Sequence, residues 1–282
     1  MIMQEVQDAG HTETGSPIVD ITGLDVFYGR LQALKDISLK IYPGEMVGIL
    51  GPNGSGKTTL LHSIMGLIPS ASGSIRLWGK DLSLYSSKEK ARIAALLPQT
   101  TETPFPFPVS DVVLMGRYPF LKLWQGYSNE DFGAAQQAMK KTGVAHLSGR
   151  PFRQLSGGER QSVLLARSFA QGSRLLLLDE ATSSLDIRRK IEVFDLLLQE
   201  NSRNNRTVLA VLHDINLASM YLNRLIFLKD GKLVAEGKTE EVLTPEILGD
   251  VYETRVLVEK HPVTCRPFIL FLTGNSRDES EI

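Results

Sequence analysis

The 282-residue chain has little cysteine, no long hydrophobic run and no excess charge of either sign. Cys265 is its only cysteine, so no disulfide can form within the chain, and a reducing compartment suits it. The 31 lysine and arginine residues nearly balance 32 aspartate and glutamate residues, which gives no general attraction to nucleic acid or an anionic bilayer. The longest apolar runs, such as residues 208–212, are far too short to span a membrane. These absences predict a soluble protein without a disulfide framework.

The first residues of the chain do not resemble a secretory signal. Residues 1–17 carry Glu5, Asp8 and Glu13 but no basic start and no apolar stretch, which argues against a secretory signal. We expect a flexible N-terminal tail there and a polar C-terminal tail over residues 272–282. The sequence shows no internal repeat and no histidine and cysteine cluster with the spacing of a metal site. Residues 18–271 are therefore expected to form one functional unit with a substantial core.

Hydrophobic patterning divides this unit into strand-rich and helix-rich parts. Alternating apolar residues predict strands over 18–28 and 34–41, and short apolar runs predict buried parallel strands over 175–178 and 208–212. Between them, from about residue 100 to residue 171, apolar residues recur at helical spacing, which predicts an inserted helical subdomain. Further strands are expected at 46–50, at 94–97, at an edge position over 75–78, and in a hairpin that turns at Asp230-Gly231. The pattern predicts an α/β fold with a mainly parallel core sheet, an antiparallel β subdomain and inserted helices.

A phosphate-binding loop follows the buried strand 46–50 and precedes a helix expected to begin near Lys57. Glycines let backbone N–H groups point at a phosphate, and the N-terminus of the next helix adds a partial positive charge. Lys57 is predicted to neutralise the β- and γ-phosphates, and the Thr58 hydroxyl to ligate Mg²⁺. The loop therefore predicts a P-loop NTPase that binds ATP with Mg²⁺. Its residues Gly51-Pro52-Asn53-Gly54-Ser55-Gly56-Lys57-Thr58, followed by Thr59, fit G-x-x-x-x-G-K-[ST].

A second small-residue turn opens another helix at Leu155-Ser156-Gly157-Gly158-Glu159-Arg160-Gln161 and also suits an anion. One triphosphate rarely needs two such cradles from one chain. A symmetric dimer can close the second cradle of one subunit over the nucleotide held by the other. The strand 175–178 then ends in Asp179 and Glu180, at the edge of the sheet where ligands of parallel sheets bind, and Asp179 is predicted to hold Mg²⁺.

The order of these motifs resembles the ATP-binding cassette (ABC) ATPases: LSGGERQ at 155–161, with the P-loop before it and LLLLDE at 175–180 after it. The resemblance implies that Ser156 and Gly158 contact the γ-phosphate of a partner subunit's nucleotide, with Gly157 and Glu159 in the same nucleotide-binding turn. It implies that Glu180 is the general base for the attacking water. It also implies that Asp186, in Ser183-Ser184-Leu185-Asp186, reaches the partner's P-loop.

Three further residues take roles from the same resemblance. His213, after the strand 208–212, is similar to the switch histidine that contacts the γ-phosphate, and Gln99, after 94–97, is similar to the glutamine that contacts Mg²⁺ and the attacking water. Lys57, Gln99, Glu180 and His213 thus form the predicted catalytic set. Tyr28 stands where the family has an adenine-stacking aromatic; the alternative is a core residue that ends its strand. The other histidines, His11, His62, His146 and His261, have no such placement.

Stretches 111–119, 211–218, 240–252 and 256–267 are similar to the ATPase subunits of importers for iron-siderophore, haem and vitamin B12. The resemblance covers nearly all of residues 18–271. It implies a homodimer at the cytoplasmic face of the cell membrane, two integral-membrane permease subunits, an extracytoplasmic binding protein that delivers cargo, and no nucleic-acid partner. Ala181, Ser183-Ser184 and Ser162 stand where proline, Asn-His and arginine are frequent, which weakens the cargo assignment. The run 103–108, with Phe105 and Phe107 among prolines, is either a permease-docking loop or a stiff connection.

Other functional classes use the same residues. An ABC exporter would share every hydrolytic residue with an importer. A non-transport ABC ATPase that acts on nucleic acid or ribosomes ordinarily has a long coiled-coil insertion or two tandem cassettes, and this sequence has neither. A nucleotide sensor without turnover is disfavoured because both Glu180 and His213 are present.

Overall fold

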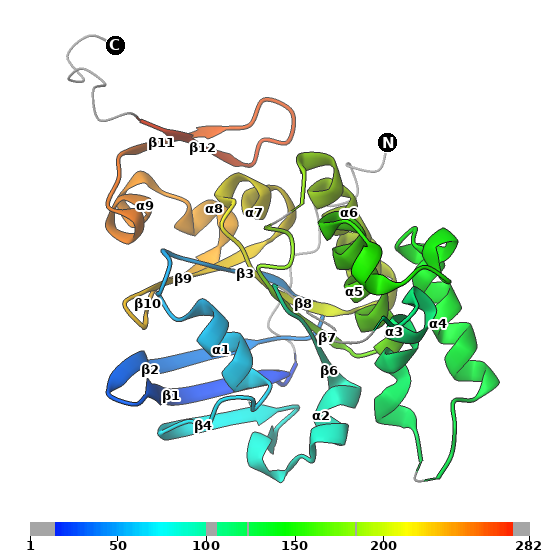
Figure 1. Cartoon of the computed structure of the whole chain (residues 1–282). Coiled ribbons are helices and arrows are strands. Elements are labelled where there is room, and N and C mark those ends of the chain that lie inside the picture. The colour runs from blue at the N-terminus through cyan, green and yellow to red at the C-terminus, as the bar shows by residue number, and fades with distance from the viewer. Residues whose placement is uncertain (1–14, 100–105, 123, 184, 273–282) are drawn as a thin grey trace.

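The computed structural model describes residues 15–99, 106–122, 124–183 and 185–272. Most of the two expected tails, and Phe105 of the proline-rich run, lie outside these residues. The strand-rich and helix-rich parts occupy different sides of a central sheet, with the antiparallel strands and the helical segment α3–α5 at opposite ends of the view (Figure 1). None of the helices in the described part of the chain combines the length and the apolar character needed to cross a bilayer.

The central sheet has six strands in the order β10-β9-β3-β8-β7-β6, and all neighbours are parallel except β10 and β9. The expected mainly parallel core sheet is confirmed. Parallel pairing brings the carboxyl ends of β3, β8, β7 and β6 to the same edge, so the loops that follow them lie together. The bounds are β3 (Met46–Leu50), β6 (Ala94–Leu97), β7 (Leu175–Asp179), β8 (Thr207–Val211), β9 (Arg224–Lys229) and β10 (Lys232–Lys238).

A second sheet is antiparallel, in the order β2-β1-β4-β5. It consists of β1 (Val19–Tyr28), β2 (Leu31–Ile41), β4 (Ser72–Leu77) and β5 (Lys80–Asp81). The expectation that residues 75–78 form an edge strand is wrong, because β4 lies between β1 and β5. Trp78 and Gly79 both have positive φ, 49° and 76°, and this tight turn sends the chain back to form the short edge strand β5.

Where the structure describes the inserted segment, over 106–122 and 124–171, it is helical as predicted and has four main helical pieces. The helices α4 and α5 each start with a capping box, Ser128 with Asp131 and Ser156 with Glu159, which satisfies backbone N–H groups at the helix start. The pieces are α3 (Val109–Leu114), the 3₁₀ segment η2 (Met115–Phe120), α4 (Asn129–Lys141) and α5 (Gly157–Gln171), with short 3₁₀ turns η3 (Ala145–Leu147) and η4 (Phe152–Gln154). The other helices are α1 (Lys57–Ile64), η1 (Leu82–Leu84), α2 (Ser87–Ile93), α6 (Ile187–Asn204), α7 (Ile215–Tyr221), α8 (Thr239–Val242) and α9 (Pro245–Tyr252).

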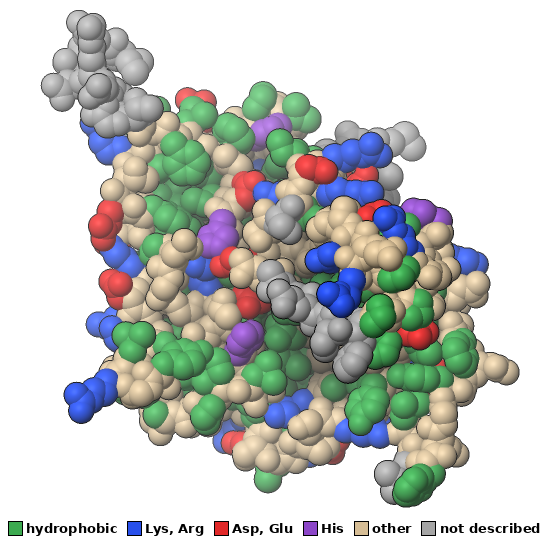
Figure 2. Space-filling model, viewed as in Figure 1, with side chains coloured by type: hydrophobic (Ala, Val, Ile, Leu, Met, Phe, Trp, Pro, Cys, Tyr) green, Lys and Arg blue, Asp and Glu red, His purple; other side chains and the backbone are tan. Residues whose placement is uncertain are grey.

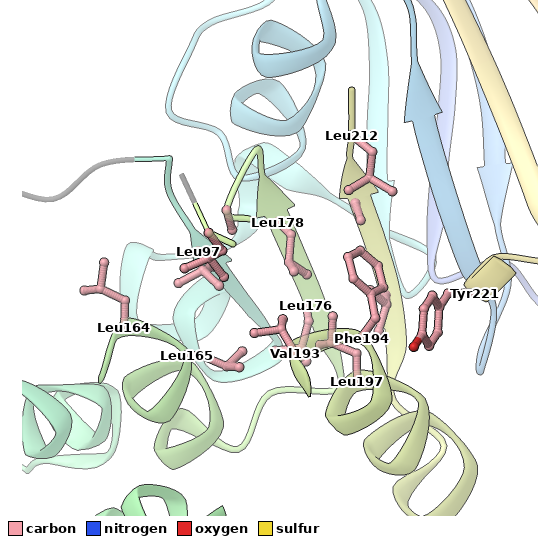
Figure 3. Packing of buried hydrophobic residues seen from close by; sticks show 14 of the residues in the cluster. Leu97, Leu164, Leu165, Leu176, Leu178, Val193, Phe194, Leu197, Leu212 and Tyr221 are labelled. Carbon is pink, nitrogen blue, oxygen red and sulfur yellow. The ribbon is translucent and has the colours of Figure 1, made fainter. Parts of the chain in front are cut away.

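The core strands bury both of their faces, which explains their continuous apolar sequences. Leu176 and Leu178 of β7 face α5 and α6 (Figure 3). Phe194 of α6 packs against Tyr221 of α7, with 5.2 Å between the ring centroids. The alternate residues Leu175 and Leu177 belong to the opposite layer, with α1 and the antiparallel sheet. The parallel strands are therefore anchored on both sides, and the loops at their ends are held in fixed positions.

The chain closes with an antiparallel hairpin that hydrophobic patterning did not predict, β11 (Val256–Lys260) and β12 (Pro267–Phe271). Its connection has no Asn-Gly or Asp-Gly pair. Instead, His261 Nδ1 accepts hydrogen bonds from the backbone N–H groups of Val263 and Thr264, and Cys265 takes a φ of 57°. The hairpin lies beyond α7 and α9 in Figure 1.

Candidate active site

The predicted phosphate-binding loop joins β3 to α1 and wraps a concave backbone surface. Gly51, Gly54 and Gly56 all have positive φ, 144°, 79° and 101°. A Cβ on Gly51 would lie 2.0 Å from the Leu228 carbonyl oxygen, so only glycine fits there. Within the described residues, the buried Ser55 hydroxyl has no hydrogen-bond partner. An unpartnered buried hydroxyl beside a glycine-rich backbone fits a loop that takes an anionic ligand.

Lys57, the first residue of α1, is folded back onto this loop. Its Nζ donates hydrogen bonds to the Gly51 and Pro52 carbonyl oxygens, at 2.9 and 2.8 Å. Burial lowers the pKa of Lys57, and the nearby Glu180 and Asp179 carboxylates oppose that shift. The ammonium therefore sits at the loop mouth, held by carbonyl groups that a phosphate would replace.

An open cavity of about 400 Å³ extends from the phosphate loop to the tip of the β1–β2 hairpin. The Tyr28 side chain lines it and is 50% exposed, so Tyr28 is not a core residue and the alternative reading of its position is excluded. The sequence did not single out Leu31 or Asp230 as part of this cavity. The lining residues are Tyr28, Leu31, Gln32, Ala33, Lys35, Asn53, Gly54, Gly56, Lys57, Thr58, Thr59, Glu180, Asp230 and Gly231.

Asp179 ends β7 next to the helix that follows the phosphate loop. The Thr58 hydroxyl donates a 2.8 Å hydrogen bond to Asp179 Oδ1, and His62 Nε2 lies 3.4 Å from Asp179 Oδ2. Burial raises the pKa of Asp179, against the hydrogen bond from Thr58 and the charge of His62. Mg²⁺ prefers oxygen ligands such as hydroxyl and carboxylate groups, so Thr58 and Asp179 fit that ion.

His62 is a neighbour of this pair, although its position in the sequence indicated no role. It stands four residues after Thr58 on α1, and residues four apart on a helix share one face. His62 therefore lies on the same face of α1 as Thr58. Because Thr58 was expected beside Asp179 at the magnesium site, the spacing could have predicted that His62 lies there too.

Glu180 lies next along the chain and meets residues from two neighbouring strands. Gln99 Nε2 donates a 2.8 Å hydrogen bond to Glu180 Oε2, and His213 Nε2 lies 2.7 Å from Glu180 Oε1. Glu180 has a φ of 50°, a conformation that costs a non-glycine residue energy and recurs at functional sites. The ends of β6, β7 and β8 thus bring three predicted catalytic residues into one cluster at the cavity.

The second predicted phosphate cradle is not part of this cluster. The Ser156 N–H donates to the Glu159 carboxylate at 2.7 Å, and the Glu159 N–H donates to the Ser156 hydroxyl at 3.3 Å, so both side chains cap α5. Asp186 accepts a hydrogen bond from the Arg189 N–H at the start of α6. None of these residues, nor Gly157 or Gly158, lines the cavity described above. A single chain therefore holds the predicted site residues as two separate groups.

Comparison with known sequences gives one family model, described as ABC transporter, that matches residues 34–183. The chain is 40% identical to the ABC transporter ATP-binding protein YvrA of Bacillus subtilis over 88% of its own length, but it spans only 56% of that relative. It is 41% identical to the hemin import ATP-binding protein HmuV of Streptomyces coelicolor, with 89% of the chain and 88% of the relative covered. It is 38% identical to the ferric enterobactin transport ATP-binding protein FepC of Escherichia coli, with 88% and 91% covered.

Solved structures are similar over comparable lengths. A structure described as an inward-facing, metal-chelate type ABC transporter matches with a TM-score of 0.80 and 28% identity, and covers 92% of this chain and 98% of that one. A dimeric bacterial ABC transporter cassette matches with a TM-score of 0.71 and 28% identity, over 78% and 98% of the two chains.

Proposed function

The chain belongs to the ABC transporter family, and from this premise we propose that it is the ATP-hydrolysing subunit of an importer for a metal chelate. The observation that carries the proposal is the position of the Glu180 carboxylate beside the phosphate loop. It accepts a 2.8 Å hydrogen bond from Gln99 Nε2 and lies 2.7 Å from His213 Nε2. A carboxylate fixed at the mouth of a triphosphate site is placed to accept a proton from an attacking water.

The proposed roles follow from the contacts of each side chain. Lys57 would exchange its bonds to the loop carbonyls for the β- and γ-phosphates, and the turn around Ser55 would offer its backbone N–H groups. Thr58 and Asp179 would hold Mg²⁺, which when bound neutralises phosphate charge. Gln99 and His213 fix the Glu180 carboxylate so that it can orient and deprotonate water. Tyr28 would stack on the adenine base at the far end of the cavity.

The remaining predicted residues do not line the cavity that holds Lys57, and we infer that they act in a second copy of the chain. Ser156, Gly157, Gly158 and Glu159 form the N-terminus of α5, and a helix N-terminus attracts phosphate. We assign them, with Asp186, to the nucleotide held by the partner in a homodimer. The dimeric cassette among the similar structures supports this arrangement.

Metal-chelate import is supported by the relatives, which include a hemin import protein and a ferric enterobactin transport protein. On that basis we assign residues 18–271 to one ABC ATPase domain with a helical subdomain over about 100–171. The domain would dock at the cytoplasmic face of the membrane under two permease subunits served by an extracytoplasmic binding protein. Iron-siderophore, haem and vitamin B12 are the candidate cargoes.

The permease contact is best sought on the helical segment. Met115, Tyr118, Trp124 and Phe132 are large apolar side chains that remain exposed there, and hydrophobic side chains are visible over α3 and α4 (Figure 2). Exposed aromatics of this kind are typical of protein interfaces. Phe107 of the proline-rich run does not fit a docking role, because its side chain packs against the main core.

Turnover by Glu180→Gln tests the proposed chemistry. General-base help accounts for roughly a hundred to ten-thousandfold in rate, so we expect the variant to lose that factor in ATP hydrolysis and to keep nucleotide binding. Glu241→Gln, an exposed carboxylate, is the matched control and should hydrolyse ATP at the wild-type rate. Wild-type turnover by Glu180→Gln would refute the assignment of the base.

Docking and cargo are tested separately from hydrolysis. Tyr118→Ser with Phe132→Ser should reduce co-purification with the permease and leave the melting temperature unchanged, whereas Val263→Ser, exposed on the distant C-terminal hairpin, should not. In liposomes with the permease and binding protein, a ferric siderophore, haem or vitamin B12 should stimulate ATP hydrolysis. A lack of stimulation by all three would rule out these cargoes while leaving the ATPase assignment in place.

A further inference from the structure

The C-terminal hairpin packs against α7, the helix that begins two residues after His213. This helix has only seven residues, and Asp214 caps its N-terminus by accepting a 2.9 Å hydrogen bond from the Leu217 N–H. A helix this short is marginal alone, so its position depends on the surrounding contacts. Because His213 precedes the cap directly, the orientation of α7 sets where the imidazole lies.

Asn216 joins α7 to the hairpin by two hydrogen bonds. Its Nδ2 donates to the Ile269 carbonyl oxygen at 3.1 Å, and its Oδ1 accepts from the Ile269 N–H at 2.7 Å. An asparagine side chain carries an NH₂ donor group and a carbonyl acceptor side by side, so it can pair with both backbone groups of one strand residue. Asn216 thereby occupies the place that a further strand would take at the edge of β12.

Two further contacts bind the same elements. The buried Ser219 hydroxyl donates to the Pro267 carbonyl oxygen. Arg266 Nη1 donates to the Ser219 and Leu222 carbonyl oxygens at 3.0 Å each, which places a cation at the C-terminus of α7. With Ile269 itself 2% exposed, separating the hairpin from α7 would break these hydrogen bonds and expose buried apolar surface.

His213 has little support from its own surroundings. Its side chain is 42% exposed, yet Nε2 lies 2.7 Å from Glu180 Oε1. The backbone sets the direction of the Cα–Cβ bond of His213, so a shift of the backbone would carry the imidazole away from that contact. The backbone is fixed on one side by β8 and on the other by the first turn of α7, which carries Asn216.

We propose that the hairpin β11–β12 is a clamp on α7 and that Asn216 is the positioning residue through which it keeps His213 directed at Glu180. The proposal rests on the proposed ATPase function for its effect on turnover.

The experiment compares Asn216→Ala with Asn223→Ala in the full chain. Asn223 Oδ1 accepts from Arg266 of the same hairpin, but beyond the far end of α7 from His213. ATP hydrolysis is measured well below the melting temperature of each variant, and hydrogen exchange of the α7 amides is measured without nucleotide. Asn216→Asp, which keeps the acceptor for the Ile269 N–H but loses the donor, provides a graded variant.

We expect Asn216→Ala to lower kcat at least about tenfold, as for a small displacement of a catalytic group, with the KM for ATP within about twofold of wild type. Exchange in α7 should accelerate while that in α1 does not, Asn216→Asp should be intermediate, and Asn223→Ala should match wild type. Unchanged kcat, unchanged α7 exchange, an effect on KM instead of kcat, or equal loss in both asparagine variants would each overturn the proposal. Failure of the ATPase function itself would appear as absent wild-type turnover, and the exchange measurement would still test the clamp.

Discussion

Replacing Asp179 by asparagine should stabilise the nucleotide-free protein and weaken its response to Mg²⁺. Asp179 is 5% exposed and lies beside a second carboxylate, Glu180. Asparagine keeps an acceptor for the Thr58 hydroxyl, which donates at 2.8 Å to Oδ1, and removes the buried charge. The side chain is nearly the same size, so packing should be unchanged.

The sign of the effect follows from the pKa. Burial raises the pKa of Asp179 above its ordinary value of 3.8, so the folded state favours the neutral acid. Burying the ionised Asp179 carboxylate lowers the free energy of unfolding. This loss is absent in acid and fully present once the pH has risen through the pKa of the folded state. At pH 7 we expect Asp179→Asn to raise the free energy of unfolding by about 1 kcal/mol, a common size for a single stabilising substitution. This corresponds to a rise of roughly 2–4 °C in Tm. Near pH 3.8 the gain should shrink.

The response to ligand should change in the opposite direction. A ligand present at a hundred times its Kd stabilises a protein by about 2.7 kcal/mol, or roughly 5–10 °C in Tm. Wild type should gain this with a non-hydrolysable ATP analogue and Mg²⁺, and much less of it with the analogue and EDTA. Asp179→Asn should lose most of the Mg²⁺-dependent difference, and Glu180→Gln should keep it. A lower Tm without nucleotide, or a full Mg²⁺ response in Asp179→Asn, would refute the reasoning.

Four further predictions concern the fold and the proposed adenine-binding end of the cavity. Buried Glu200 has its pKa lowered, because the hydrogen bond from Lys141 and the charge of Arg206 outweigh burial; Glu200→Gln should lose about 3 kcal/mol at pH 7, and its deficit in urea unfolding should shrink as the pH falls below 4.5. A Cβ on Gly116 would lie 2.3 Å from the Arg167 carbonyl oxygen, so Gly116→Ala should cost about 1–3 kcal/mol. Gly133→Ala, in open space on α4, should instead gain up to about 1 kcal/mol. Tyr28→Ala should raise the KM for ATP roughly 5–150-fold, the equivalent of 1–3 kcal/mol of stacking, and Tyr28→Phe should not.

The sequence was sufficient for features that depend on local chemistry. The glycine-rich turn between β3 and α1 was predictable because its glycines, Lys57 and Thr58 lie in one short segment, and the core strands because strands buried on both faces are continuously apolar. The cluster of Gln99, Glu180 and His213 required more, since β6, β7 and β8 must be neighbours in the sheet. The family resemblance supplied that order, and the individual roles of these residues stay predictions.

The features that the sequence did not predict depend on distant contacts. Phe107 looks like an exposed ring among prolines, but its carbonyl oxygen accepts a hydrogen bond from the Phe152 N–H and its side chain joins the core. The hairpin β11–β12 is stabilised at its edge by Asn216, about fifty residues earlier in the chain. Sequence patterns report what a segment prefers alone, and these two segments are fixed by partners that no local pattern contains.

The separation of the two phosphate cradles within one chain leads to a complementation experiment. In a homodimer that shares its sites, each site takes Lys57 from one subunit and Gly158 from the other. Lys57→Ala and Gly158→Asp should each abolish turnover; a Cβ on Gly158 would make only ordinary contact with Leu185, at 3.6 Å, so the second variant should fold normally. Mixed in equal amounts, half of the dimers contain both variants, and each of these has one intact site. The mixture should therefore recover about a quarter of wild-type activity if the sites act independently. If each chain completed its own site, mixing would restore nothing, and the assignment of Ser156, Gly158 and Asp186 to a partner's nucleotide would be wrong.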